Sequence, residues 1–250
     1  MPGYQANGDE ILYGHVGERS LLTDEFVVAA GDGVTEYYDQ YGSLCRVDLE
    51  AGAYYSFEAA DIHFCAEGKG MIKVCDGVPH DENGPAYKDQ ATSQWYRHGL
   101  LHRLDGPAII CPSYQAWYKD DRQHRDPGPD GDVGPAFISD DEQIWYWNGL
   151  RHRLPDADGN IGPARIEDGN RYWYAQDRLH RQDGPAVEYS SGAVEYWWCG
   201  GYHREDGPAL IDTDGSERYA LDGNIFEDKK TWEHALRVRR EISERGSPKT

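Results

Sequence analysis

A histidine followed by an arginine recurs along the chain at regular intervals. The five pairs are His102-Arg103, His124-Arg125, His152-Arg153, His180-Arg181 and His203-Arg204. Imidazole binds metal ions and exchanges protons near neutral pH, and guanidinium binds phosphate, so a column of such pairs would suit a metal or phosphate site. A catalytic centre needs one set of groups, whereas this pair recurs in every well-formed repeat. The recurrence therefore favours a structural role, in which each histidine hydrogen-bonds the following turn, and predicts no metal site.

An aromatic residue stands seven positions before each of these histidines. These residues are Trp95, Trp117, Trp145, Trp173 and Tyr196, and each is followed by a second aromatic residue. Adjacent residues of a strand point to opposite faces, so one row of rings builds the core and the other lies outside. Trp147, Trp197 and Trp198 exceed the repeat pattern and are candidate binding residues, because exposed rings form a platform for a ligand or partner.

The phrase Gly-Pro-Ala sets the period of the repeat. Its six copies begin at Gly84, Gly106, Gly134, Gly162, Gly184 and Gly207, at spacings of 22, 28, 28, 22 and 23 residues. Short repeats that bury their apolar faces on one another are typical of stacked architectures. We expect the glycine to adopt a positive φ, the proline to fix the next φ, and the alanine to allow close stacking.

Each repeat contains strand-like segments separated by turn residues. Ala108 and Ile110 show the period-two pattern of a strand after Gly-Pro-Ala, while Asp168-Gly169 and Asn148-Gly149 are typical hairpin turns. The sequence therefore predicts a mainly β fold. We expect an elongated, solenoid-like array of antiparallel β-hairpins over residues 70–228.

Two repeats are six residues longer than their neighbours. The additional residues lie between His-Arg and Gly-Pro-Ala, within 126–133 and 154–161. Because the frame of the array is kept, these segments are predicted to be loops on one edge, where repeat proteins often carry their binding function. The candidate binding residues beside and within these loops are Arg125, Arg153, Asp130 and Asp158.

The chain is strongly acidic, with 45 Asp and Glu against 25 Lys and Arg and a formal net charge of −20. Such a surface repels nucleic acid and anionic lipid and attracts basic partners. Pairs such as Arg103/Asp105, Arg181/Asp183 and Arg204/Asp206 are expected to form within the repeats. The charge favours a protein partner with a basic surface and argues against nucleic acid or a membrane.

The cysteines and the first residues predict the compartment. Five scattered cysteines without a Cys-x-x-Cys pair are typical of free thiols in a reducing environment. The N-terminal residues lack the segments of a secretory signal, and no apolar run approaches the roughly 20 residues that cross a bilayer. We expect a cytoplasmic protein. No nucleotide-binding motif is present, so no cofactor is predicted.

The N-terminal residues 1–69 depart from the repeat. They predict an acidic β region, with strands near 10–13, 25–30 and 54–57 and a turn at Gly31-Asp32-Gly33. Degenerate repeats are expected in this region, because the end repeats of an array must face water.

The C-terminal residues predict a helix that covers the open end of the array. It is expected over 229–245, with Asp228 as N-cap and with an apolar stripe formed by Trp232, Ala235, Leu236 and Ile242. Residues 246–250 are expected to form a disordered tail.

The segment Trp95–Ala108 reads Trp-Tyr-x-x-Gly-Leu-x-His-Arg-x-Asp-Gly-Pro-Ala. This phrase resembles the β-hairpin repeats of uncharacterised phage and giant-virus proteins and, more distantly, the MORN-like repeats of YwqK-type bacterial proteins. The likeness covers roughly residues 70–228 and implies a hairpin array of phage origin. The chain lacks the Tyr-x-Gly-x-Trp core of true MORN repeats, so the resemblance does not imply lipid binding. It transfers no catalytic residue.

Three functional hypotheses follow. The first is a non-enzymatic acidic repeat protein that binds a protein partner, such as a phage-encoded inhibitor of a host factor. The second is a small-molecule sponge or receptor, in which aromatic rows and arginine columns hold a nucleotide-like ligand between loops 126–133 and 154–161. The third is an enzyme with a site in residues 1–69, where His15, Asp61 and His63 lie.

Overall fold

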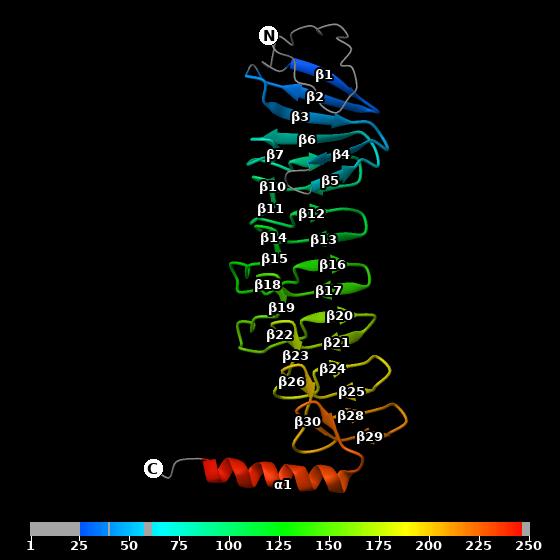
Figure 1. The fold of residues 1–250 in the computed structure, drawn as a ribbon, viewed down its shortest axis with the longest axis vertical. Helices are drawn as coiled ribbons and strands as arrows, with labels where there is room; N and C mark the ends of the chain where they lie inside the picture. The colour runs from blue at the N-terminus through cyan, green and yellow to red at the C-terminus, as the bar shows by residue number, and fades with distance from the viewer. Residues whose placement is uncertain (1–25, 40, 58–61, 247–250) are drawn as a thin grey trace. The chain divides into compact units, whose positions relative to one another are not determined.

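The computed structural model describes residues 26–39, 41–57 and 62–246. The chain divides into two compact units, residues 1–100 and residues 101–250. The predicted mainly β fold is confirmed, since antiparallel hairpins build both units and α1 (Lys229–Gly246) is the single helix of the described residues (Figure 1).

The first unit is built on an antiparallel sheet. In order of pairing its strands are β1 (Phe26–Gly31), β2 (Val34–Tyr38), β3 (Leu44–Leu49), β6 (Gly70–Cys75), β8 (Tyr87–Lys88) and β9 (Ser93–Gln94). The other strands up to the unit boundary are β4 (Tyr54–Phe57), β5 (Ile62–Cys65), β7 (Val78–Pro79), β10 (Tyr96–Arg97) and β11 (Leu100–Leu101). Thus β1 and β4 are the strands expected near 25–30 and 54–57, while the strand expected at 10–13 lies outside the described residues.

A buried carboxylate organises one end of this first sheet. Asp89 is 7% exposed and accepts hydrogen bonds from the backbone N–H groups of Glu67, Ala91 and Thr92 and from the Tyr87 hydroxyl. Burial by itself raises the pKa of Asp89, but these donors outweigh burial, so its pKa lies below the usual value. The charged form of Asp89 therefore stabilises the fold.

The second unit contains a ladder of ten antiparallel strands. In order of pairing they are β12 (Ile109–Ile110), β13 (Tyr114–Ala116), β16 (Phe137–Ser139), β17 (Glu142–Ile144), β20 (Arg165–Glu167), β21 (Asn170–Tyr172), β24 (Val187–Glu188), β25 (Val194–Glu195), β28 (Leu210–Ile211) and β29 (Glu217–Arg218). Sequence order equals pairing order, so each repeat adds its strands to the previous repeat.

A column of short hairpins, in which each strand has two residues, runs beside the ladder (Figure 1). These strands are β14 (Tyr118–Lys119), β15 (Arg122–Gln123), β18 (Tyr146–Trp147), β19 (Leu150–Arg151), β22 (Tyr174–Ala175), β23 (Arg178–Leu179), β26 (Trp197–Trp198), β27 (Gly201–Tyr202), β30 (Ala220–Leu221) and β31 (Asn224–Ile225). Both turn residues have positive φ, as in Asn148-Gly149 at 50° and 84°, which matches the type I′ turns expected for tight hairpins. Successive hairpins are connected by backbone hydrogen bonds, such as the one that the Gly149 N–H donates to the Gln123 carbonyl (2.9 Å).

The alanine of Gly-Pro-Ala lies where ladder and hairpin column meet. Ala136, Ala186 and Ala209 are completely buried. The Ala136 carbonyl accepts the N–H of Trp117 (2.8 Å), and its N–H donates to the carbonyl of Ile144 (2.8 Å). A larger side chain would separate these neighbours, so the close stacking predicted for alanine is confirmed.

The expectation of a positive φ at the glycine of this phrase is wrong. The glycines with positive φ lie in turns, and those that begin Gly-Pro-Ala are not among them. They are needed for close approach instead, since a Cβ on Gly162 would lie 2.5 Å from Nη1 of Arg153.

Helix α1 packs on the last hairpin of the second unit. The Asp228 carboxylate accepts the Thr231 N–H (2.8 Å), as expected of an N-cap. Trp232 and Leu236 are buried against Leu221 of β30, which confirms the predicted cap. Ile242 does not belong to the buried stripe, because it is 65% exposed. None of the helical segments in the described residues has the length and apolar character that a membrane span requires.

We predict that Asp89→Asn lowers the free energy of unfolding by about 1–3 kcal/mol at pH 7, because a buried acceptor of four hydrogen bonds loses its charge. Since the pKa of Asp89 is lowered in the folded state, the stabilisation is present above the unfolded-state pKa and disappears as pH falls through the folded-state pKa. Urea unfolding from pH 7 to pH 3 measures this difference. The exposed turn residue Asp76 supplies the control, Asp76→Asn, which should change little; an equal loss in both variants would contradict the assignment.

Candidate functional site

The repeated arginine lies between an aromatic ring and a proline carbonyl. The Arg181 guanidinium carbon is 3.9 Å from the centroid of the Trp173 ring, and Nη1 donates to the Pro185 carbonyl (3.1 Å). The same pair of contacts is made by Arg125, Arg153 and Arg204. Each of these guanidinium groups therefore has a structural role in its own loop.

The short loops add a carboxylate to this arrangement. Asp105, Asp183 and Asp206 accept from Nε of the arginine two residues earlier, at 2.8, 3.0 and 2.6 Å, so the predicted Arg/Asp pairs are found. The hydrogen bond from Arg181 holds the pKa of Asp183 below its usual value. The Asp183 and Asp206 side chains are 84% and 82% exposed, so both carboxylates are open to solvent.

The two long loops are anchored by the tryptophan of the following repeat. Trp145 Nε1 donates to the Val133 carbonyl (2.6 Å), and Trp173 Nε1 donates to the Ile161 carbonyl (3.1 Å). Arg153 lies over the ring of its own repeat, and burial lowers its pKa. These contacts explain how the added residues are accommodated without disturbing the frame.

The predicted aspartates of the long loops lie at the surface. Asp130 and Asp158 are exposed. The Asp130 carboxylate accepts the backbone N–H of Asp132 (3.2 Å), while the Asp158 N–H donates to Asp156 (3.0 Å). Both are therefore parts of local turns, and the structure does not bring them to the predicted tryptophans.

The repeated histidine contacts the next hairpin of the column. Nδ1 accepts a backbone N–H from the turn of the following repeat in four cases: His102 from Asp120, His124 from Asn148, His180 from Cys199 and His203 from Asp222. His152 is different, since its buried Nδ1 has no hydrogen-bond partner among the described residues. In the described part of the chain, no group of three or more His, Cys, Asp or Glu side chains is arranged to hold a metal ion.

The predicted tryptophans occupy two kinds of position. Trp147 and Trp198 stand at the same place in different hairpins, over His124 and His180 with ring centroids 4.4 and 4.3 Å apart. Hairpin β22–β23 separates them, so they do not form one cluster. Trp197 packs against Tyr202, with the ring planes tilted by 36° and the centroids 3.9 Å apart.

The column of first aromatics lies inward. Trp145 and Trp173 are buried, and Trp95 and Trp117 are half-buried. Among the predicted tryptophans Trp147, Trp197 and Trp198, the most exposed is Trp198, at 43%.

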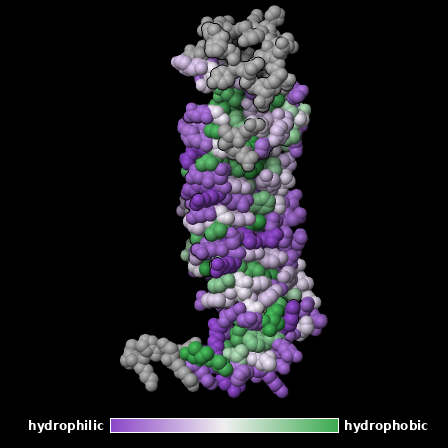
Figure 2. Space-filling view, in the orientation of Figure 1, coloured by the Kyte–Doolittle hydropathy of each residue, from purple (hydrophilic) through white to green (hydrophobic). Residues whose placement is uncertain are grey.

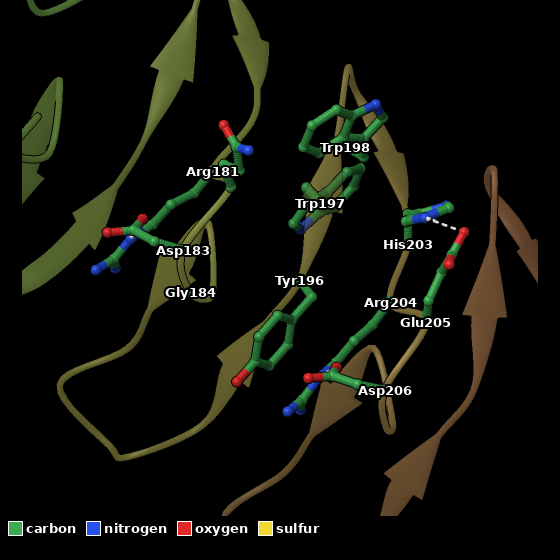
Figure 3. Close-up of a pocket in the computed structure, with 11 residues that line it drawn as sticks. Arg181, Asp183, Gly184, Tyr196, Trp197, Trp198, His203, Arg204, Glu205 and Asp206 are labelled. Atoms are coloured by element: carbon green, nitrogen blue, oxygen red, sulfur yellow. Dashed lines mark hydrogen bonds and ion pairs between the residues drawn. The ribbon is translucent and has the colours of Figure 1, made fainter.

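A groove of about 430 Å³ lies between two consecutive short loops of the second unit and is our candidate functional site. Figure 3 shows the rings of Trp197 and Trp198 on β26 and that of Tyr196 just before it, with the Arg181/Asp183 and Arg204/Asp206 pairs on the loops to either side. The sequence predicted Trp197 and Trp198, but not the loop carboxylates. The predicted Trp147, Arg125, Arg153, Asp130 and Asp158 do not line this groove.

A second groove of about 530 Å³ lies at the corresponding place between the Arg103 and Arg125 loops. Here Lys119 takes the position of Trp198, and Asp126 takes that of Glu205. Lys119 Nζ lies 3.1 Å from Asp126, whose pKa is lowered by a hydrogen bond from His124 and by this lysine. Aligning the repeats position by position would have revealed this pairing from the sequence.

Of the residues proposed for an enzyme site, the structure describes His63 alone. His15 and Asp61 lie outside the described residues. His63 is exposed on β5, and its Nδ1 lies 2.6 Å from the Tyr54 hydroxyl, with the two rings stacked. The described contacts of His63 therefore show a surface pair.

Comparison with known proteins gives no relative for this chain. No family model matches it, and neither the curated proteins nor the solved structures contain a match. The likeness to phage, giant-virus and MORN-like repeats consequently stays a prediction from the repeated phrase.

We predict that each long loop is held in place by the tryptophan that donates a hydrogen bond to it, Trp145 for loop 126–133 and Trp173 for loop 154–161. Trp145→Phe removes the hydrogen bond to Val133 but keeps most of the ring, and should loosen loop 126–133. Because one hydrogen bond contributes about 1 kcal/mol, hydrogen exchange in that loop should accelerate about fivefold. Trp173→Phe is the matched variant and should affect loop 154–161 alone. Equal exchange in both loops of both variants would contradict the assignment.

Proposed function

We propose that this chain is a non-enzymatic, acidic repeat protein that binds a protein partner through a basic surface of that partner. The observation that carries the proposal is the groove between the Arg181 and Arg204 loops, in which exposed carboxylates border three aromatic rings. Aromatic rings supply contact area at protein interfaces, and peripheral charges steer the encounter.

The charge of the second unit supports this choice of partner. Residues 101–228 contain 25 Asp and Glu against 12 Lys and Arg, and hydrophilic residues predominate on the face shown in Figure 2. The repeated guanidinium groups are held by rings and proline carbonyls, whereas many carboxylates point to water. An acidic excess of this kind accelerates association with a basic protein and weakens with salt.

The acidic surroundings of the arginines weigh against the alternative of a nucleotide-like ligand. The phosphates of such a ligand would be repelled by Asp132 and Asp156, which act electrostatically on Arg153. An enzyme site in residues 1–69 stays a prediction. The five free cysteines agree with a reducing, cytoplasmic setting, and the resemblance to phage repeats extends the proposal to inhibition of a host factor.

Affinity capture tests the proposal. The full chain, immobilised through its N-terminus, should retain a specific protein with a basic surface from lysate in 0.1 M NaCl and release it by about 0.5 M, where charge screening is strong. Failure to retain any specific protein, or retention that salt does not weaken, would contradict the proposal.

A variant with both long loops shortened to the length of the short loops locates the binding surface. The groove between the Arg181 and Arg204 loops lies outside these long loops, so we expect the shortened chain to capture the same protein. If the shortened chain folds but no longer captures the protein, the binding surface lies on loops 126–133 and 154–161.

A further inference from the structure

Three hydrogen bonds connect one hairpin of the column to the next, and we name each such joint by its histidine. The second turn residue donates to a carbonyl of the preceding hairpin, the first turn residue donates to the histidine Nδ1, and the repeated arginine donates its N–H to a carbonyl of the following hairpin. At the His203 joint these bonds run from Gly223 to Tyr202 (2.9 Å), from Asp222 to His203 (3.1 Å) and from Arg204 to Ala220 (3.1 Å). The His102 and His180 joints have the same three bonds.

The His152 joint keeps one of the three. The Asp177 N–H donates to the Arg151 carbonyl (3.1 Å). Among the described residues, the buried Nδ1 of His152 has no hydrogen-bond partner, and the Arg153 N–H makes no bond to the Tyr174 carbonyl. A buried polar atom without a partner costs free energy, so this joint lacks two contacts that stabilise the other joints.

The long loops explain half of this difference. The His124 joint also precedes a long loop, and in the described part of the chain it too lacks the arginine bond, but its histidine still accepts the Asn148 N–H (3.0 Å). Loss of the histidine bond is therefore specific to the His152 joint.

An ion pair stands in for the missing bonds. Oδ1 of Asp177 accepts hydrogen bonds from Nε of Arg151 (2.7 Å) and from the Arg151 N–H (3.1 Å), and the guanidinium carbon lies 4.1 Å from the centroid of the Tyr174 ring. The Arg151 and Asp177 side chains are 31% and 39% exposed. Water and salt reach such a pair, and pairs of this kind contribute little stability.

The ladder is continuous beside this joint (Figure 1). Strands β17 and β20 pair over three residues, from Glu142↔Glu167 to Ile144↔Arg165, and Arg165 Nε lies 2.5 Å from Glu142. The Trp145 N–H donates to the Ala164 carbonyl (2.8 Å). The two repeats are thus firmly joined on the ladder side and weakly joined on the hairpin side.

We propose that the His152 joint is a hinge of the second unit, at which the hairpin column opens while the ladder stays paired. The Arg151–Asp177 pair holds the hinge closed, and salt favours opening because it screens the pair. Opening separates hairpin β22–β23 from hairpin β18–β19, which gives the second unit a place where its curvature can change.

Amide hydrogen exchange of the full chain, followed by NMR, tests the hinge. The Asp177 N–H is compared with the Gly200 and Gly223 N–H groups, which make the same bond at complete joints, and each rate is divided by its unfolded-chain value. We expect Asp177 to exchange at least tenfold faster than both glycines, because one hydrogen bond corresponds to about fivefold. Equal protection at the three positions would overturn the proposal.

Salt separates opening of the hinge from general loosening. Between 0.05 M and 1 M NaCl, exchange at Asp177 should accelerate about threefold, while Gly200, Gly223 and the ladder N–H of Trp145 change less than twofold. Acceleration of Trp145 together with Asp177 would overturn the proposal, because the ladder would then open as well.

Aspartates at the same turn position supply matched variants. Asp121 accepts the N–H of Leu101 (2.7 Å), as Asp177 accepts that of Arg151, but its joint keeps all three bonds. Asp177→Asn should accelerate exchange of the residue 177 N–H at least threefold and abolish its response to salt. Asp121→Asn should change exchange at residue 121 less than twofold. Equal acceleration in the two variants would overturn the role of the ion pair.

Two histidine variants test the unpartnered nitrogen. His180→Leu removes the acceptor of the Cys199 N–H (3.2 Å) and should accelerate exchange at Gly200 about fivefold. His152→Leu removes an atom without a partner, so exchange at Asp177 should stay the same or become slower. Acceleration at Asp177 in His152→Leu would overturn the proposal, because it would show that a water molecule already bridges this joint.

Discussion

The second unit depends on one repeated contact, a guanidinium group held between an aromatic ring and the proline carbonyl of Gly-Pro-Ala. Arg153 lies 4.3 Å from the Trp145 ring centroid and donates to Pro163, and this joins the two ends of its loop. A cation over an indole is favourable by about 0.5–2 kcal/mol, depending on exposure. Because the contact recurs in successive repeats, it can fix their register even though each copy is modest.

This constraint separates structural residues from residues available for binding. Histidine, arginine, the first aromatic residue and Gly-Pro-Ala recur because every repeat needs them. Positions that vary between repeats, such as Trp198 and Lys119, lie at the grooves. The residues that differ between repeats are therefore the ones that can make a ligand prefer one place, since a scaffold that is the same everywhere offers equivalent surfaces.

The repeat architecture, the capping helix and the Arg/Asp pairs could be predicted from the sequence, because period and turn chemistry are local properties. The reason why Gly-Pro-Ala begins with glycine could not be predicted. At Gly162 a side chain would collide with the guanidinium group of Arg153, which lies on the other side of the loop. The sequence also predicted only some of the residues that line the groove between the Arg181 and Arg204 loops. Trp197 and Trp198 stood out by composition, whereas Asp183 and Asp206 looked like ordinary turn residues until the loops were placed beside one another. Trp147 lies in a different hairpin from Trp197 and Trp198, with β22–β23 between, so the structure does not bring the three predicted tryptophans together.

The most direct test of this account is a double-mutant cycle between Gly162 and Arg153, measured by urea unfolding. Gly162→Ala should cost about 1–2 kcal/mol in the wild type, since the added methyl displaces the guanidinium, and much less in an Arg153→Met background. Gly84→Ala is the control, because the same phrase there has only Asp81, 3.5 Å from the added carbon. A cost that is the same with and without Arg153 would contradict the central role of the guanidinium contact.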